Sequence, residues 1–287
     1  MRKILVTGGS GFIASFLVEK LLEKEYEVTI FDIDKPKFTP NVTYIKGDIT
    51  DREAVFEAIK GQDAVFHYAG MIGTHELVMK AYESAKINIL GALNIFDAAK
   101  MYGVAVYDVT KPNCWRNPYT ITKIAAEEFG LMYRDEFKMP VVLLRYFNVF
   151  GPRQKTDIFQ KAVPTFILHA LKNEPIEIYG DGTQGTDHIY VEDVAEATIR
   201  IFESGFIPEK AVEIGSGNEI TVNEIAEKII ELTNSTSRIV YIPMRMGETE
   251  HTRIKADISY LHNIIGFEPR HSFEEGLKKT IEFYKNI

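Results

Sequence analysis

A glycine-rich turn between a short apolar run and a helical pattern is the feature that most constrains the fold of this chain. The run Lys3–Thr7 predicts a buried strand, residues 8–11 (GGSG) follow it, and Gly11–Lys24 has apolar residues at helical spacing. Glycines let the backbone turn tightly and approach a pyrophosphate, and the helix that follows offers unpaired N–H groups. The motif predicts a dinucleotide site, with the cofactor-binding residues Gly8, Gly11, Phe12 and Ile13.

Asp32, at the end of the next predicted strand, strengthens this interpretation. A glycine turn alone can serve merely to pack a helix on a strand, but Asp32 lies 21 residues after Gly11 (32 − 11). An acid that binds ribose hydroxyls is expected about 20 residues after the turn. The carboxylate would repel a 2′-phosphate, and no arginine follows in the sequence Ile33-Asp34-Lys35. NAD is therefore favoured over NADP.

The first half of the chain alternates short β-branched runs with longer helical patterns. Strands alternating with helices imply right-handed crossovers and a mostly parallel sheet covered on both faces. We predict an α/β fold with a doubly wound Rossmann sheet. The predicted strands cover 3–7, 27–32, 42–46, 63–68, 104–109 and 140–146, and the predicted helices 11–24, 51–60, 83–100 and 118–137.

The pattern changes after Gly151-Pro152, where glycines and prolines become frequent. Helices are predicted over 158–172, 192–204, 221–233 and 272–285, and the last two begin with capping boxes. We expect a smaller α/β region over the carboxyl ends of the first sheet, where open parallel sheets bind ligands. Residues 1–150 and about 186–215 are predicted to form the NAD-binding domain, and 151–185 and 216–287 the substrate-binding domain.

Composition excludes several classes of protein. The single cysteine, Cys114, rules out a disulfide scaffold and fits a reducing compartment. No apolar stretch reaches the roughly 18 residues of a membrane span, and the N-terminus is not a signal peptide. A net charge of −8 argues against a protein that coats nucleic acid. We expect a cytoplasmic protein with no membrane or nucleic-acid partner, and no metal site is predicted.

Tyr119 and Lys123 are four residues apart at the start of the predicted helix 118–137, so they share a helix face. A phenol, with a free pKa of about 10, is a poor base at neutral pH, but a neighbouring ammonium stabilises the phenolate. Such a tyrosine can accept a proton from a sugar hydroxyl. The spacing is also typical of a core tyrosine beside a solvated lysine. Its position after a complete dinucleotide-binding half favours a catalytic role.

With these residues in place, the chain resembles the extended short-chain dehydrogenase/reductase family over essentially its whole length. Within that family it is similar to the nucleotide-sugar epimerases and dehydratases, which include UDP-glucose 4-epimerase. The resemblance rests on these segments: TGGSGFIA (7–14), Asp32, Gly47-Asp48-Ile49, VFHYAG (65–70), NILGALN (88–94), Tyr119 and Lys123, RYFNVFGPRQ (145–154), IYGDGTQ (178–184), YVEDVAEA (190–197) and MRMGE (244–248).

The resemblance implies further cofactor-binding residues. Asp48 and Ile49 would hold the adenine. Tyr68, Ala69 and Gly70 would line the path of the cofactor's phosphates and ribose. These positions follow the third and fourth predicted strands, at the sheet edge that carries the glycine turn.

The resemblance also implies the catalytic set. Thr110 falls where the family has its catalytic serine or threonine, so its hydroxyl would hydrogen-bond the reacting oxygen. Asn88 would lie near the strand ends at the active site, among the cofactor-binding residues. Tyr119 and Lys123 would be both catalytic and cofactor-binding.

Substrate-binding residues follow from the same resemblance. Asn148 and Arg245 fall where the family grips the nucleotide diphosphate, and a guanidinium suits that role because it binds phosphate oxygens bidentately. Tyr179, in IYGDGTQ, is counted with them. The region over the sheet is thus expected to bind a nucleotide sugar.

The sequence departs from the family in two places. Thr110 and Tyr119 are only nine residues apart, where the family has a longer substrate-facing loop, so the sugar pocket is expected to be altered. Thr186 stands where the family often has an arginine. Compensating charges could come from Arg153, Arg116 or His188.

The short loop bears on the reaction. Dehydratases resembling this chain carry an Asp-Glu pair just after the catalytic threonine, and decarboxylases carry a glutamate nearby; here Lys111 and Pro112 follow. We predict an NAD-dependent 4-epimerase of a UDP-hexose-like substrate, acting through a transient 4-keto sugar with Tyr119 as base. One alternative is a dehydratase with an atypical loop, in which the Cys114 thiol acts in the elimination. Another is a non-catalytic NAD-binding sensor. The nucleotide base and the sugar stay open.

Family members often dimerise through the two helices that correspond to 83–100 and 118–137. Apolar residues on the second helix permit this, although they could equally cover the sheet. A homodimer is therefore an expectation from the resemblance. The residues concerned are Ile124, Phe129, Met132 and Tyr133.

Overall fold

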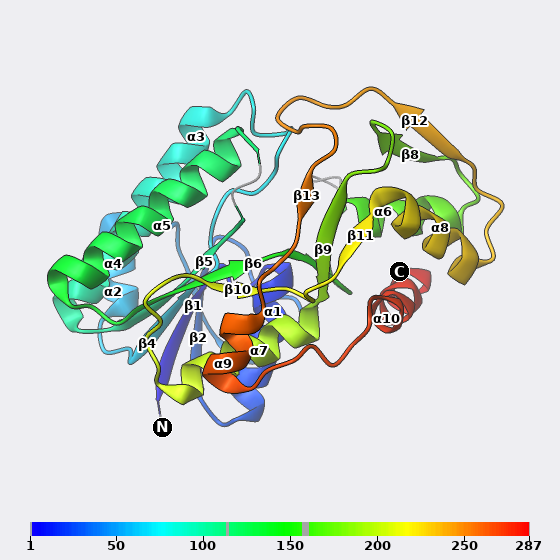
Figure 1. Ribbon diagram of the computed structural model, residues 1–287. Helices are drawn as coiled ribbons and strands as arrows, with labels where there is room; N and C mark the ends of the chain where they lie inside the picture. Colours follow the sequence, from blue (N-terminus) through cyan, green and yellow to red (C-terminus); the bar gives the residue numbers. More distant parts are fainter. Residues whose placement is uncertain (1, 113–114, 157–160, 287) are drawn as a thin grey trace.

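A seven-stranded, all-parallel sheet is the centre of the computed structural model, which describes residues 2–112, 115–156 and 161–286 (Figure 1). The predicted fold class, a doubly wound Rossmann sheet, is confirmed. The strands along the sheet are, in spatial order, β10 (Val212–Ile214), β6 (Val141–Tyr146), β5 (Ala105–Thr110), β4 (Ala64–His67), β1 (Lys3–Thr7), β2 (Glu27–Asp32) and β3 (Thr43–Lys46).

The strand order fixes where a ligand can lie. From β1 the chain builds outward to β2 and β3 on one side, then returns to β4 on the other side of β1. At such a switch point the loops after the two central strands turn in opposite directions and leave a crevice at their carboxyl ends. The glycine turn after β1 and residues 68–70 after β4 flank this crevice.

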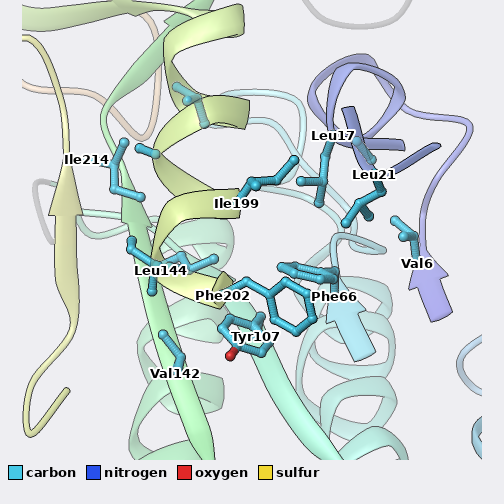
Figure 2. Packing of buried hydrophobic residues seen from close by; sticks show 14 of the residues in the cluster. Val6, Leu17, Leu21, Phe66, Tyr107, Val142, Leu144, Ile199, Phe202 and Ile214 are labelled. Atoms are coloured by element: carbon cyan, nitrogen blue, oxygen red, sulfur yellow. The ribbon is translucent and has the colours of Figure 1, made fainter. Parts of the chain in front are cut away.

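Helices cover both faces of the sheet. Helices α1 (Phe12–Glu23), α7 (Val191–Ser204) and α9 (Ser259–Ile265) share one apolar cluster with one face. Helices α2 (Arg52–Ile59), α4 (Gly91–Tyr102) and α5 (Pro118–Phe137) pack on the other. Figure 2 shows the first cluster, in which Ile199 and Phe202 of α7 pack against strand residues such as Phe66 and Tyr107.

The single helix predicted over 83–100 is interrupted. It consists of α3 (Ala81–Ala85), a π-helical turn over Lys86–Leu90 and α4. A π turn inserts one residue into the helical ladder and often marks a functional position. Asn88, a predicted site residue, lies in this turn. One inserted residue shifts the apolar period by a single position, so the sequence over 83–100 still reads as one helix.

A smaller region lies beside the carboxyl edge of the main sheet, at the right of Figure 1. Its core is a separate apolar cluster with helices α6 (Ala162–Leu171), α8 (Val222–Thr233) and α10 (Phe273–Lys285). The capping boxes predicted for the last two helices are present. The strands of this region were not predicted: β7 (Asn148–Phe150), β9 (Gly185–Tyr190), β11 (Glu219–Thr221) and β13 (Arg253–Ile254) in one sheet, β8 (Ile176–Tyr179) and β12 (Ile239–Ile242) in another.

Two further points bear on the predictions. The start of the helix predicted over 158–172 lies outside the described residues, and α6 begins at Ala162. Helix α9 packs against α7 and against β10 of the main sheet. The predicted division assigns α9 to the substrate-binding domain, although these contacts are with the predicted NAD-binding domain. In the ranges that the structure covers, no helix combines the length and apolar character needed to cross a membrane.

Candidate active site

The turn after β1 is shaped to let a ligand approach the backbone. Gly8 has φ +67°, and a Cβ there would lie 2.5 Å from the Ala69 amide nitrogen, so only glycine fits. Gly11 is the N-cap of α1, and in the described part of the chain no side chain caps that helix N-terminus. Its first amides and dipole are therefore available to an anion. Phe12 and Ile13 begin the helix and also line the large cavity described below.

Asp32 lies against this turn. Its Oδ2 accepts a hydrogen bond from the Ser10 amide at 2.9 Å, and its Oδ1 accepts one from the Asp34 amide at 3.0 Å. The carboxylate is thus fixed at the end of β2, partly exposed, next to the predicted phosphate turn. A bare glycine turn, an uncapped helix and a fixed acid together suit a dinucleotide with free ribose hydroxyls.

The residues predicted around the adenine and phosphates lie at the same sheet edge. Asp48 is exposed, and its side chain accepts a hydrogen bond from the Thr50 amide. Ile49 is buried, and Asn94 of α4 holds its carbonyl at 2.9 Å. After β3 the Asp48 side chain is thus exposed, whereas the side chain of the next residue, Ile49, packs in the apolar core.

Tyr68, Ala69 and Gly70 follow β4 directly. Ala69 flanks Gly8, and Gly70 is exposed. The Tyr68 hydroxyl lies 2.5 Å from that of Tyr146, and burial raises its pKa well above the usual range. The phenol of Tyr68 is therefore engaged within the chain, so it is the backbone of 68–70 that borders the crevice.

Asn88 connects the loop after β4 to helix α5. It is 2% exposed, its Oδ1 accepts from the Met71 amide at 2.7 Å, and its Nδ2 donates to the Met71 carbonyl at 2.9 Å. Nδ2 also lies 3.0 Å from Thr122 Oγ1 of α5. The π turn thus ties the loop after β4 to the helix that carries Tyr119 and Lys123.

Thr110, Tyr119 and Lys123 converge at the carboxyl edge of β5. Thr110 ends β5; it is 2% exposed and its hydroxyl has no hydrogen-bond partner among the described residues. Asn117 caps α5 through the Thr120 amide, which places Tyr119 and Lys123 in the first two turns on one face. The Lys123 side chain is only 10% exposed, and its Nζ lies 3.9 Å from Oδ1 of Asp108.

A cavity of about 370 Å³ extends from Thr110 and Tyr119 to the smaller region. Asn148, Tyr179 and Arg245 all line it, so the structure brings the three predicted substrate residues together with two of the catalytic ones. Arg245 packs over the Tyr179 ring at 4.8 Å and pairs with Glu248 at 2.8 Å. Asn148 donates to the Asp187 carbonyl at 3.2 Å.

The segment that carries Arg245 is held by the catalytic region. The Asn117 side chain donates to the Gly247 carbonyl at 2.9 Å, and the Trp115 indole donates to the Thr252 hydroxyl at 2.8 Å. Thr74 hydrogen-bonds Glu248. The short loop after β5 therefore joins the two regions around the cavity. Cys114, singled out in that loop, lies outside the described residues.

Three charged residues near the site were not predicted. Lys111 lines the cavity, its Nζ lying 2.7 Å from Thr120 Oγ1 and 5.5 Å from the Tyr119 ring centre. Lys161 lines the cavity at the start of α6, and burial lowers its pKa. Asp108 is fully buried in β5. A charge inside an otherwise apolar strand (AVYDVT) was the available signal for Asp108.

The candidates for replacing the arginine at Thr186 differ in their surroundings. Arg153 pairs with Glu19 at 2.9 Å and stacks over Phe16, and it is not among the residues that line the cavity. Arg116 is exposed and is not among those lining residues. His188 does line the cavity, but burial lowers its pKa to about 4, so it is neutral at pH 7. Among the described residues that line the cavity, Lys111 and Lys161 are the lysines that accompany Arg245.

Comparison with known proteins gives consistent results. Residues 4–215 match the family model described as "NAD dependent epimerase/dehydratase family". The chain is 32% identical to the UDP-N-acetyl-alpha-D-glucosaminuronate decarboxylase of Bacillus cytotoxicus, over 100% of this chain and 98% of that protein. It is 31% identical to the mouse dTDP-D-glucose 4,6-dehydratase, over 99% and 89%.

Solved structures agree with these relatives. The crystal structure of UDP-glucose 4-epimerase with UDP-glucose from Thermotoga maritima superimposes with a TM-score of 0.93 at 29% identity, over 99% of both chains. The relatives are named for decarboxylation, dehydration and epimerisation. Their similarity therefore establishes a family without selecting one reaction.

Proposed function

The chain belongs to the NAD dependent epimerase/dehydratase family, and on this premise we propose that it is a nucleotide-sugar epimerase that inverts carbon 4 of a UDP-hexose-like substrate. The observation that carries the proposal is the convergence of Thr110 and Tyr119 on a cavity that reaches Arg245. Acid–base groups and a phosphate-binding cation are then spaced along one ligand path. A non-catalytic sensor would not need this set.

The cofactor of the family is NAD, and the glycine turn with Asp32 supplies residues that fit it. When bound, NAD supplies hydride removal and hydride return at carbon 4. The chain's own residues then have to position the sugar and handle its proton.

Tyr119 is the base in this proposal. Its phenolate takes the proton of the sugar's 4-hydroxyl while carbon 4 gives up its hydride, and these two losses together leave a transient 4-keto sugar. When the hydride returns to carbon 4, the same phenol returns the proton to the new hydroxyl. The ammonium groups of Lys123 and Lys111 favour the phenolate. Thr110, whose buried hydroxyl has no partner among the described residues, donates a hydrogen bond to the same oxygen.

Arg245 holds the diphosphate. Its guanidinium lines the cavity, and its Nε is buried without a hydrogen-bond partner in the described ranges. An orphaned donor of this kind suits bidentate contact with phosphate oxygens. Binding the nucleotide at the far end would leave the keto sugar free to turn, so that either face of carbon 4 could receive the returning hydride, which inversion at carbon 4 requires.

The residues after Thr110 favour epimerisation over elimination. The dehydratases that the sequence resembles carry an Asp-Glu pair directly after this threonine. Here Lys111 and Pro112 follow Thr110, and neither is a carboxylate. Reversible oxidation at a single carbon needs no further group.

The direct test is product analysis. The protein is incubated with NAD and a panel of UDP-, dTDP- and GDP-sugars, and products are separated as isomers and weighed by mass spectrometry. We expect a new isomer of unchanged mass from a UDP-hexose. A product lighter by one water would replace the epimerase proposal with a dehydratase, and one lighter by carbon dioxide with a decarboxylase.

We also propose a homodimer formed through α4 and α5. Met101 on α4 and Ile121, Met132 and Phe137 on α5 are exposed apolar side chains on these neighbouring helices. Tyr133, by contrast, packs in the core beneath them. Sedimentation or light scattering should give twice the monomer mass, and charged substitutions at Ile121 and Met132 should reduce it.

A further inference from the structure

Strand β5 carries an acid where its neighbours are apolar. Asp108 has no solvent exposure, and neither carboxylate oxygen makes a well-formed hydrogen bond to a described residue, although the adjacent Val109 amide lowers the pKa of Asp108. Burying a carboxylate without partners is costly, and native proteins rarely do so without a functional reason. Burial raises the pKa of Asp108 to about 6, and the Lys123 ammonium opposes this rise.

Lys123 is the nearest opposite charge. Its Nζ lies 3.9 Å from Asp108 Oδ1, and its side chain is 10% exposed. A lysine removed from water tends to lose its proton unless an anion compensates. In the proposed reaction Lys123 has to be charged, because only the ammonium favours the phenolate of Tyr119 one turn earlier.

The other titratable groups near the pair have interaction partners of their own. Glu127, one turn further along α5, pairs with Arg145 of β6, which also binds Glu213 at 3.0 Å. His67 of β4 is opposite Asp108 in the sheet register and bonds the Thr7 hydroxyl at 2.7 Å. Burial, together with the Lys123 charge, lowers the pKa of His67 to about 3, so it is neutral and does not balance Lys123.

We propose that Asp108 is a positioning residue for the reaction: from beneath the site it keeps Lys123 protonated and directed along α5 toward Tyr119. The inference rests on the proposed function for its catalytic meaning. It assigns a role to a buried acid that does not line the substrate cavity and that the epimerase mechanism itself does not use.

The test is the pH profile of kcat for Asp108→Asn. Without the carboxylate, Lys123 loses its proton at lower pH, so the alkaline limb of kcat should move down by at least one pH unit. At pH 8 we expect at least a tenfold loss of kcat, largely recovered at pH 6, with KM for the nucleotide sugar unchanged within about threefold. A uniform loss at every pH, with the limb in place, would show a merely structural role and overturn the proposal.

Tyr107→Phe is the matched control. Tyr107 precedes Asp108 on β5, is equally buried and packs on the Phe66 ring. Its variant perturbs the same strand without touching the charge pair. In this variant the alkaline limb of the pH profile of kcat should lie at the same pH as in the unmodified protein.

Unfolding equilibria test the pair separately from turnover. Lys123→Met leaves a buried, uncompensated carboxylate, so it should destabilise the fold, and adding Asp108→Asn should restore at least tenfold in the unfolding constant. Additive effects in this cycle would overturn the pairing. If the unmodified protein converts no nucleotide sugar, the proposed function fails, while the cycle still decides whether Asp108 and Lys123 act as a unit.

Discussion

The two sides of the sheet's carboxyl edge satisfy their polar groups in different ways. On the side of the glycine turn, Asp32 is held by two backbone amides and His67 by the Thr7 hydroxyl. On the side of Tyr119, several buried polar atoms have no partner among the described residues. These atoms belong to Asp108, Thr110, Gln154, Gln184 and Arg245, and the last four residues line the cavity.

The difference lies in the side chains: Asp32 and His67 on the turn side are held by other groups of the chain, whereas a cluster on the catalytic side is not. Most buried polar groups in native proteins are hydrogen-bonded, so a cluster of exceptions needs a cause. On the turn side it is the first backbone amides of α1 that remain open to the cofactor. On the catalytic side, the unpartnered atoms of the four cavity-lining residues are available to hydrogen-bond the substrate. Substitutions on the two sides should therefore separate stability from turnover.

The largest effect is expected from Tyr119→Phe. Removing the phenolic hydroxyl removes the base, so kcat should fall by roughly 10³-fold. Because the ring remains in the cavity, the protein should stay folded and should still bind the nucleotide sugar. Steady-state assays measure kcat and substrate binding, and thermal unfolding shows whether the variant is folded. Tyr82→Phe, on an exposed tyrosine of α3, is the control and should leave activity intact. Residual activity within tenfold would remove Tyr119 from the role of base.

Gly8→Ala should act on the opposite side, through stability and NAD binding together. The substitution forces φ +67° on an alanine and places its Cβ 2.5 Å from the Ala69 amide nitrogen. We expect a loss of about 3 kcal/mol in unfolding free energy and no detectable NAD binding. Gly61→Ala shares the strained backbone, at φ +78°, but meets no atom within 4 Å. It should lose only about 1 kcal/mol. Equal losses in the two variants would show that close approach to Ala69 is unimportant.

Thr110→Val sharpens the contrast. Because the Thr110 hydroxyl bonds nothing among the described residues, its removal should leave the unfolding free energy unchanged or raise it by about 1 kcal/mol. Turnover should nevertheless fall about 100-fold, since a donor to the reacting oxygen is lost. Thr198→Val is the control, because Thr198 is equally buried but bonds the Val194 carbonyl and the Tyr146 hydroxyl. It should cost about 1 kcal/mol of stability. A destabilised Thr110→Val would mean that the hydroxyl has a structural partner.

The last prediction concerns the pH dependence of stability. Burial lowers the pKa of His67 to about 3, so between about pH 6.5 and 3 the unfolded chain binds a proton there that the folded chain does not. The stability that the folded chain gains from keeping His67 neutral is fully present above about pH 6.5 and is lost as the pH falls toward 3. His67→Gln should flatten the slope of unfolding free energy by up to about 1.4 kcal/mol per pH unit. His75→Gln, which removes an exposed loop histidine, is the matched control for the substitution itself. Denaturant titrations from pH 4 to 7 would show either outcome.

Much of the fold could be predicted from the sequence because its elements are long and periodic. The strands of the main sheet read as continuous apolar runs, and the helices between them repeat apolar residues at helical spacing. Strand β10 of the main sheet was not predicted, and neither were β7 to β9 and β11 to β13. None of these strands has the run of three or more consecutive buried residues that β1, β2, β4, β5 and β6 have. Without a sustained period, such strands are defined by their partners.

The candidate site divides in the same way. Gly8, Asp32, Tyr119 and Lys123 were predicted because each belongs to a spacing that local geometry enforces. Lys111 was noted only as a departure from the family, and Asp108 was not noted at all. Their importance comes from what lies opposite them in space.

By itself the sequence determined the doubly wound sheet, the dinucleotide turn and the tyrosine–lysine pair, because backbone sterics and helical periodicity act over a few residues. Tertiary structure alone decided which buried polar atoms are left without partners, and that Asp108 lies 3.9 Å from Lys123. Charge balance in a buried site depends on distances between elements that are remote in sequence. Those distances are fixed only when the sheet and its helices pack.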